Sequence, residues 1–292
     1  MPILAISHKT TYAYRHPVML GPHQFMLRPR ESRDLKLISH EIDISPQAEL
    51  AWSQDVAGNA IASATFQSPA DRLTIESWVK VDLSAPMWPI FPISVSAVEY
   101  PFLYSNDDWT DLGALTRPHY EDIEHRFSQW VEGFVFQRPT DTLSLLKDIN
   151  NGISTQIAYE TRESEGTQSP LETLSRGRGS CRDWAVLLAE SARLLGLGAR
   201  LVSGYLFDPN NDLVGSAASG STHAWVEIYL PGAGWITFDP TNRSLGAGNL
   251  IPVAVARDIR QAVPVAGSFA GPSDALLDMT VAVSVSCLPT SL

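Results

Sequence analysis

Three residues have the types and the chain order of a thiol-based catalytic triad: Cys181, His223 and Asp239. A cysteine thiolate can attack a carbonyl carbon, and an imidazole can take and return the proton. A carboxylate can hold the imidazole in the required tautomer. Together the three groups would carry out acyl transfer at an amide bond through a thioester intermediate.

The sequence predicts that Cys181 lies at the N-terminus of a helix. Apolar residues follow it at helical spacing, and glycines end the pattern, at Trp184, Leu188, Ala192, Leu195, Gly196 and Gly198. The free N–H groups and positive dipole end of a helix favour a thiolate and could hold an oxyanion. Most free cysteines are instead small buried hydrophobic residues. We expect that role for Cys287, which continues the alternating apolar face of Val281, Val283 and Val285.

His223 and Asp239 fall on two strands that we expect to form a hairpin, 222–230 and 235–239. Alternation puts His223 and Trp225 on the face opposite to Ala224. His223 and Asp239 share a face only if directly paired residue numbers add to an even value, as when Trp225 opposes Asp239. A two-residue turn would put Asp239 on the wrong face. The triad therefore predicts a three- or five-residue loop, or a bulge.

The sequence also suggests residues that bind substrate. Gly179 leaves the backbone beside the thiol open to approach, and Trp225 on the histidine face could line a groove. Tyr205, at the end of the segment 196–205, is assigned with them. The second oxyanion donor is not identified, and the candidates are Gln156, Tyr159 and Gln168.

These residues sit in a chain that the sequence divides into two domains. Residues 1–100 show short alternating runs typical of an antiparallel β-sandwich or barrel, and prolines between 86 and 101 mark the domain link. Residues 101–292 read as an α+β domain that includes the C-terminal strands. We expect its helices after Pro118, after Thr140 and from Cys181. We expect its strands over 200–207, 222–230, 235–239, 250–256 and 280–287, with a flexible loop at 215–221.

Composition excludes several classes of protein. The chain has 292 residues, a net charge of −11 and no basic run, which argues against nucleic-acid or anionic-membrane binding. Two cysteines do not make a disulfide scaffold, and no segment has the apolar length of a signal peptide or a membrane span. We expect a cytoplasmic protein. The histidines lack zinc-site spacing, 208–219 departs from a calcium loop, and no cofactor is expected.

A succession of four segments resembles the bacterial transglutaminase-like superfamily, whose members are described as cysteine proteases. The segments are Gly-Ser-Cys-Arg-Asp-Trp-Ala, 196–205, His-Ala-Trp-Val-Glu and 234–241. The flanks, with Tyr-Ala-Tyr-Arg-His-Pro-Val and Ile-Pro-Val-Ala-Val-Ala-Arg-Asp-Ile, resemble the N-terminal β domain and the C-terminal strands of one subgroup. The resemblance implies a papain-like α+β core with Cys181 as nucleophile, His223 as base and Asp239 as orienting carboxylate.

The resulting expectation is hydrolysis of an amide or peptide bond in a protein or peptide substrate. Protein-glutamine transamidation by the same triad remains an alternative, as does a non-catalytic peptide-binding or scaffold protein that retains the fold. The N-terminal domain or the segment 246–275 could also cover the site. The sequence leaves the oligomeric state open.

Overall fold

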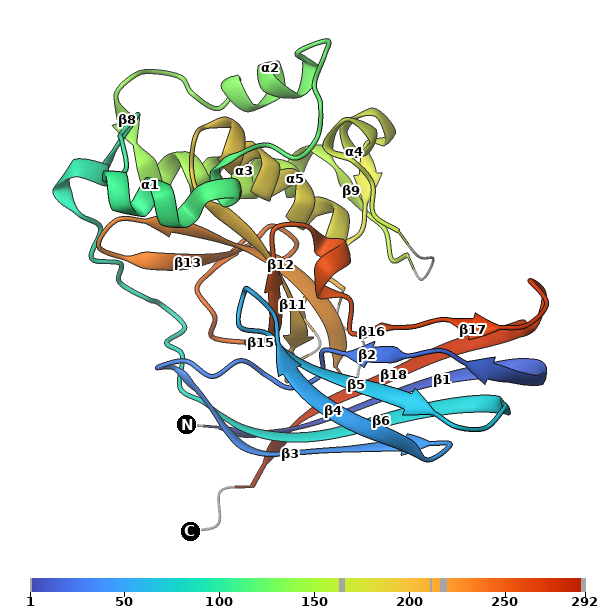
Figure 1. Ribbon diagram of the computed structural model, residues 1–292. Coiled ribbons are helices and arrows are strands. Elements are labelled where there is room, and N and C mark those ends of the chain that lie inside the picture. Colours follow the sequence, from blue (N-terminus) through green and yellow to red (C-terminus); the bar gives the residue numbers. More distant parts are fainter. Residues whose placement is uncertain (1, 163–165, 211, 216–219, 290–292) are drawn as a thin grey trace.

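The computed structural model describes residues 2–162, 166–210, 212–215 and 220–289. It is an α+β protein in which a β-sandwich lies against a mixed helix-and-sheet core (Figure 1). The α+β class expected from the sequence is confirmed. Among the described residues, no helix has both the length and the apolar character needed to cross a membrane.

The first sandwich sheet is built on β1 (Ile3–Leu20). Along one side β1 pairs with β6 (Ala70–Leu83), which in turn pairs with β3 (Leu35–Ser45). On its other side β1 pairs with β18 (Leu276–Leu288) and, near its end, with β17 (Phe269–Ala270). All these pairings are antiparallel.

The second sandwich sheet has four antiparallel strands: β16 (Val265–Ala266), β2 (His23–Phe25), β5 (Ala60–Phe66) and β4 (Ala48–Gln54). Side chains of both sheets form a common core that includes Tyr14, Phe25, Leu73 and Ile75. The C-terminal strands β16, β17 and β18 therefore pair within the sandwich. We expected these strands in the second domain, 101–292, but all three complete sheets begun by residues 3–25.

The core domain has one five-stranded antiparallel sheet. Its order is β14 (Ser244–Leu245), β13 (Gly234–Asp239), β12 (Ser221–Leu230), β11 (Ala199–Leu206) and β15 (Leu250–Ala256). Helix α5 (Cys181–Leu194) packs on one face of this sheet, against Ala224, Val226 and Ile228. The other described elements of this region are η1 (Val95–Ala97), β7 (Glu99–Tyr100), α1 (Asn106–Leu112), η2 (Gly113–Thr116), α2 (Arg126–Glu132), β8 (Thr140–Asp141), α3 (Thr142–Gln156), β9 (Ala158–Tyr159), α4 (Pro170–Arg176), β10 (Arg178–Gly179) and η3 (Ile259–Ala262).

The sandwich packs against the core sheet at two places: on the face opposite to α5, its Ala57 packs against the cluster that contains Val202 and Trp225. At the second place, Leu4, Ile6 and Val81 of the sandwich pack with Tyr205 and Ile251 of the core sheet. The core sheet is therefore buried on both faces, although β12 alternates polar and apolar residues like a strand with one wet face.

Hydrogen bonds also fix this junction. The side chain of Asn59, which is completely buried, donates to Val255 O at 2.8 Å and accepts from Val255 N at 2.9 Å. It thereby pairs with β15 as a neighbouring strand would. His8 Nδ1 lies 3.0 Å from the Tyr205 hydroxyl, on the same junction.

Of the two helices expected after Pro118 and after Thr140, the second begins close to the predicted position. Helix α3 begins at Thr142 behind Asp141, whose carboxylate accepts from Ser144 N. The helix expected from Pro118 is wrong in its start, because α2 begins only at Arg126. The carboxylate of Asp122 accepts from the N–H groups of Phe127 and Ser128, and His125 has a left-handed φ of 56°. The predicted loop 215–221 falls largely on 216–219, outside the described residues.

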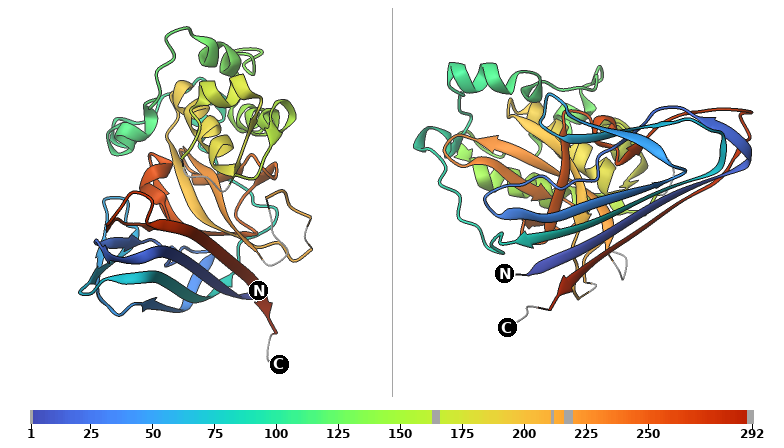
Figure 2. Two further views of the ribbon diagram at one scale, coloured as in Figure 1. Left: turned by 90° about the vertical axis from the view of Figure 1, so that its right-hand side faces the viewer. Right: turned by 60° about the horizontal axis from the view of Figure 1, so that its bottom comes forward.

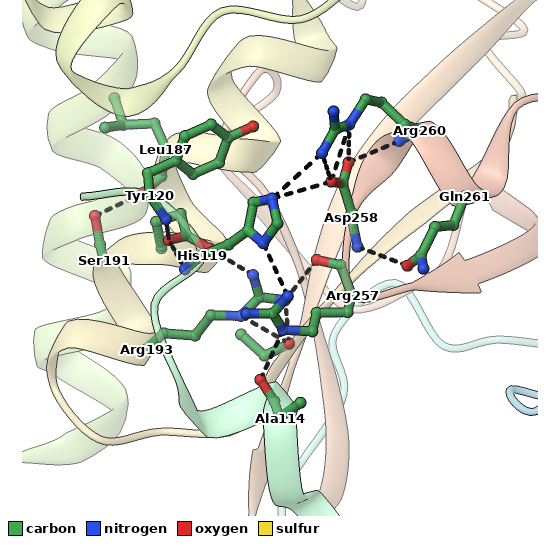
Figure 3. A network of polar contacts seen from close by, with 12 residues as sticks. Ala114, His119, Tyr120, Leu187, Ser191, Arg193, Arg257, Asp258, Arg260 and Gln261 are labelled. Carbon is green, nitrogen blue, oxygen red and sulfur yellow. Dashed lines mark hydrogen bonds and ion pairs between the residues drawn. The ribbon is translucent and has the colours of Figure 1, made fainter.

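A buried polar network holds the far end of α5 (Figure 3). Glu190 and Arg193 form an ion pair with 1 % side-chain exposure each. Glu190 accepts from His119 N at 2.7 Å, and Arg193 donates to the backbone carbonyls of Ala199 and Arg257. The network joins α5 to β11, β15 and the segment after η2, so it fixes the helix that carries Cys181 relative to the sheet.

Candidate active site

Cys181 is the first residue of α5, as predicted, and its side chain is half-buried. The preceding residue, Ser180, is the N-cap. The carboxylate of Asp183 accepts hydrogen bonds from both the N–H and the hydroxyl of Ser180, each at 2.8 Å. This capping arrangement defines where the helix starts, and so where the thiol lies.

Asp183 is completely buried and also ties α5 to the segment before α4. Its other oxygen accepts from Gln168 N at 2.7 Å and from Arg162 Nη2 at 2.8 Å. Arg182 Nη2 donates to Arg162 O at 3.1 Å. The N-terminus of α5 is therefore held by a charge-assisted set of bonds rather than by packing alone.

The hairpin of β12 and β13 brings His223 to Asp239. Val226 opposes Phe238 and Leu230 opposes Gly234, so paired numbers add to 464 and a three-residue loop joins the strands. The even register predicted from the sequence is confirmed. His223 Nε2 lies 2.9 Å from Asp239 Oδ2, with side-chain exposures of 0 % and 1 %.

The remaining contacts orient this buried pair. Asp239 Oδ1 accepts from Thr241 N at 2.9 Å, and Asp239 Oδ2 accepts from Asn242 Nδ2 at 2.8 Å. The ring of His223 stacks on Trp225, with centroids 6.1 Å apart. His223 Nδ1 is buried and makes no hydrogen bond of normal geometry within the described residues. Because Asp239 occupies Nε2, Nδ1 is the nitrogen left for the thiol.

Electrostatics favour a charged thiolate–imidazolium pair. Burial raises the pKa of the Cys181 thiol, but the interaction with His223, the Ala224 N–H and the charge of Arg182 outweigh burial and hold it below its usual value. Burial lowers the pKa of His223, but Asp239 and Cys181 raise it above its usual value overall. Burial raises the pKa of Asp239, yet His223, Asn242 and Thr241 keep that pKa low.

The three residues assigned to substrate binding do not line an open surface. Trp225 is 1 % exposed and packs with Val202 and Leu250, and Tyr205 is 2 % exposed against the sandwich. Both assignments are corrected, because each ring is buried: Ala57 of the sandwich packs against the Trp225 cluster, and Leu4 and Ile6 of the sandwich pack with Tyr205.

Gly179 is also buried, beneath α5. A Cβ at that position would lie 2.9 Å from Asp183 Cβ and 3.2 Å from Trp184 Cδ1. The glycine permits close packing of β10 against α5 and does not open the backbone to substrate.

Of the three candidate oxyanion donors, Tyr159 interacts electrostatically with the Cys181 thiol. Strand β9 pairs in parallel with β10, Tyr159 opposite Gly179, and its ring contacts Trp184 edge-on at 5.7 Å. Burial and the nearby charge of Cys181 raise the pKa of Tyr159, so its hydroxyl stays protonated. Gly215 lies beside the Tyr159 hydroxyl. A Cβ added at Gly215 would lie only 2.5 Å from the hydroxyl oxygen.

The other two candidates are placed differently. Gln156 accepts from Trp130 Nε1 at 2.8 Å and lines a groove of about 240 Å³ between α2, α3 and α4. The side chain of Gln168 is buried, with neither amide atom hydrogen-bonded within the described residues.

Cys287 is exposed, so the expectation of core packing is wrong for this residue. Strand β18 lies at the border of its sheet, and the inner face there is only partly covered. Within the described part of the chain, no group of three or more histidine, cysteine or acidic side chains is arranged to hold a metal ion.

Comparison with known families identifies both parts of the chain. Residues 4–82 match the bacterial transglutaminase-like N-terminal region, and residues 129–240 match the core of the transglutaminase-like superfamily. The chain belongs to this superfamily and carries its bacterial N-terminal region.

Two mycobacterial relatives match along almost the whole chain. An uncharacterized protein of Mycobacterium leprae is 24 % identical over 282 residues, covering 96 % of this chain and 98 % of the relative. One of Mycobacterium tuberculosis is 26 % identical over 293 residues, covering 95 % and 91 %. A crystal structure from Cytophaga hutchinsonii, described as a candidate cysteine protease, matches 100 % of this chain and 92 % of its own. The TM-score is 0.74 at 18 % identity, a likeness of fold.

Proposed function

We propose that this protein is a cysteine peptidase or amidase that cleaves an amide bond through Cys181, His223 and Asp239. The observation that carries the proposal is the buried hydrogen bond of 2.9 Å between His223 Nε2 and Asp239 Oδ2, on a sheet packed against the helix that begins with Cys181. The description of the Cytophaga hutchinsonii protein supports the same chemistry.

The proposed reaction has two halves. The Cys181 thiolate attacks the amide carbonyl, and the backbone N–H groups at the start of α5 stabilise the oxyanion. The His223 imidazolium gives its proton to the leaving nitrogen as the C–N bond breaks, which leaves a thioester. His223 then takes a proton from water, the hydroxyl adds to the thioester carbon, and the C–S bond breaks to restore the thiolate and imidazolium.

The decisive test is the pH dependence of iodoacetamide alkylation at each cysteine, followed by mass spectrometry. Cys287 is exposed and serves as an internal reference thiol. We expect Cys181 to react well below the ordinary thiol pKa of about 8.5, and His223→Ala to abolish that advantage. If Cys181 followed Cys287 across the whole pH range, the proposal would be wrong.

A second measurement separates hydrolysis from amine transfer. Labelled casein is incubated with the enzyme, with and without a fluorescent primary amine. We expect hydrolysis, in which water accepts the acyl group and peptide or ammonia is released. This release should be absent in the Cys181→Ser variant. Incorporation of the amine at glutamine without hydrolysis would replace the peptidase assignment with transamidation.

A further inference from the structure

The outer edge of β18 is open over the first half of the strand. Among the described residues, β1 is the strand that pairs with β18, and the seven residues 276–282 are all exposed. Figure 2 shows β18 as the outermost strand of its sheet. This edge therefore presents backbone N–H and C=O groups that only another extended chain can pair in order.

The two edges of the same sheet differ in charge and regularity. The opposite edge, β3, carries Lys36, Glu41 and Asp43, and its ladder shifts between Leu37 and Ser39. Strand β18 has one charged residue, Asp278, and its ladder with β1 runs without a shift from Leu288 to Asp278. Charges and irregularities are what natural proteins use to stop edges from pairing; β18 has them only at its start, at Asp278 and the register shift beside it, and lacks them from Met279 onward.

An apolar stripe runs along the open part of β18. Met279 and Val281 oppose Tyr12 and Thr10 of β1, on the face where Thr10 is buried. Met279 is nevertheless 38 % exposed and Val281 48 % exposed. The stripe could receive alternate side chains of a chain added to the edge.

The edge leads toward the candidate active site. A Cβ at Gly220 would lie 2.7 Å from Val285 N, so the residue before β12 rests on β18. At about 3.4 Å per residue, Val281 lies about 14 Å along β18 from Val285, and Gly220 about 10 Å along the chain from His223. An extended peptide of ordinary length spans that interval.

We propose that the edge formed by residues 276–282 of β18 docks an extended, alternately apolar segment of the polypeptide substrate, which adds to the sheet as a strand. The inference rests on the proposed function, because the docked chain continues to Cys181. A seven-residue edge is short for a second copy, since stable interfaces bury about 800 Å² per partner. A substrate that must leave after cleavage fits a short edge better.

The test uses the full chain carrying Cys181→Ser, so that binding is read without turnover. The probe is a fluorescein-labelled nine-residue peptide of alternating valine and threonine, N-methylated at every second residue to leave one open hydrogen-bonding edge. The control peptide is N-methylated at every residue. Binding is followed by fluorescence anisotropy, and its location by hydrogen–deuterium exchange.

We expect the probe to bind and to slow amide exchange in residues 276–282, and the control peptide to do neither. Val281→Lys should weaken binding at least about tenfold. The matched variant Ile38→Lys places the same charge at an exposed position of the opposite edge and should leave binding unchanged.

Absence of probe binding, or protection elsewhere than in 276–282, would overturn the docking site. Concentration-dependent protection of 276–282 without peptide, together with dimers in sedimentation, would show that a second copy covers the edge and would overturn it too. Failure of the proposed function is separate: Cys181 would then alkylate as an ordinary thiol, whatever the probe does at β18.

Discussion

At the residue scale, the Asp239 carboxylate orients His223 and is itself held in place by its neighbours. It accepts the hydrogen bond of His223 Nε2, and it is itself fixed by Thr241 N and Asn242 Nδ2. All of these hydrogen bonds need an acceptor at position 239. A carboxylate offers two acceptor oxygens, whereas an uncharged amide in its place could present a donor. The tautomer of His223 is therefore set by Asp239.

We predict that Asp239→Asn leaves Cys181 in place but lowers its reactivity at pH 6 by at least about tenfold, because the raised pKa of His223 depends on the carboxylate. Alkylation of Cys181 relative to Cys287 measures this. Asn242→Ala is the matched control, since it removes one neutral donor to the same oxygen. An equal loss in both variants would contradict a special role for the charge.

The same pair makes stability depend on pH. The pKa of His223 is raised from 6.5 in the folded protein, so its contribution is complete below pH 6.5 and declines as the pH rises toward the raised value. The pKa of Asp239 is lowered from 3.8, so its contribution is complete above pH 3.8 and is lost as the pH falls toward the lowered value.

We predict that, relative to His223→Gln, the wild type loses unfolding free energy as the pH rises above 6.5, by up to about 1.4 kcal/mol per pH unit. Urea unfolding of both proteins between pH 5 and 9 measures the difference. A difference that stayed constant across this range would show that His223 does not titrate with a raised pKa in the folded state.

At the scale of elements, Asp183 is the group that holds the nucleophile in register. Its buried carboxylate accepts from Ser180, Gln168 and Arg162. The beginning of α5 is thus tied to the chain before α4, and the thiol moves only if that set of bonds breaks.

We predict that Asp183→Ala destabilises the protein by about 3–5 kcal/mol, because it leaves Arg162 and three buried donors without their acceptor. Ser180→Ala removes one of these hydrogen bonds and should cost about 1 kcal/mol. Urea unfolding measures both. Equal losses in the two variants would show that the carboxylate is not the anchor of the helix.

At the scale of the whole molecule, the sandwich and the core domain share one junction. The sandwich is built from both ends of the chain, and its Ala57 packs on the face of the core sheet that carries Trp225. The same junction buries Asn59 against β15. The N-terminal region is thereby part of what buries Trp225, on which the ring of His223 stacks.

We predict that Asn59→Ala costs about 2–4 kcal/mol, since Val255 N and Val255 O are left buried without partners. Tyr205→Phe, which removes only the contact with His8, should cost about 1 kcal/mol. Thermal unfolding measures both losses. Separate transitions for the two domains in Asn59→Ala would show how far this side chain couples them, and an unchanged midpoint would contradict the prediction.

The sequence by itself determined the local features of the site. The start of α5 at Cys181 follows from capping and helical periodicity, and the even register of the hairpin follows from the two-residue period of a strand. These features depend on interactions between near neighbours in the chain, which residue types and spacing encode directly.

Only the tertiary structure decided which distant strands pair and which side chains the sandwich buries. It paired β18 with β1 across more than 260 residues, buried Trp225 and Tyr205 under the sandwich, and left Cys287 exposed. Alternation along a strand indicates two faces, but it does not say whether a second layer from elsewhere in the chain lies on the polar one. That depends on long-range packing, which no local period records.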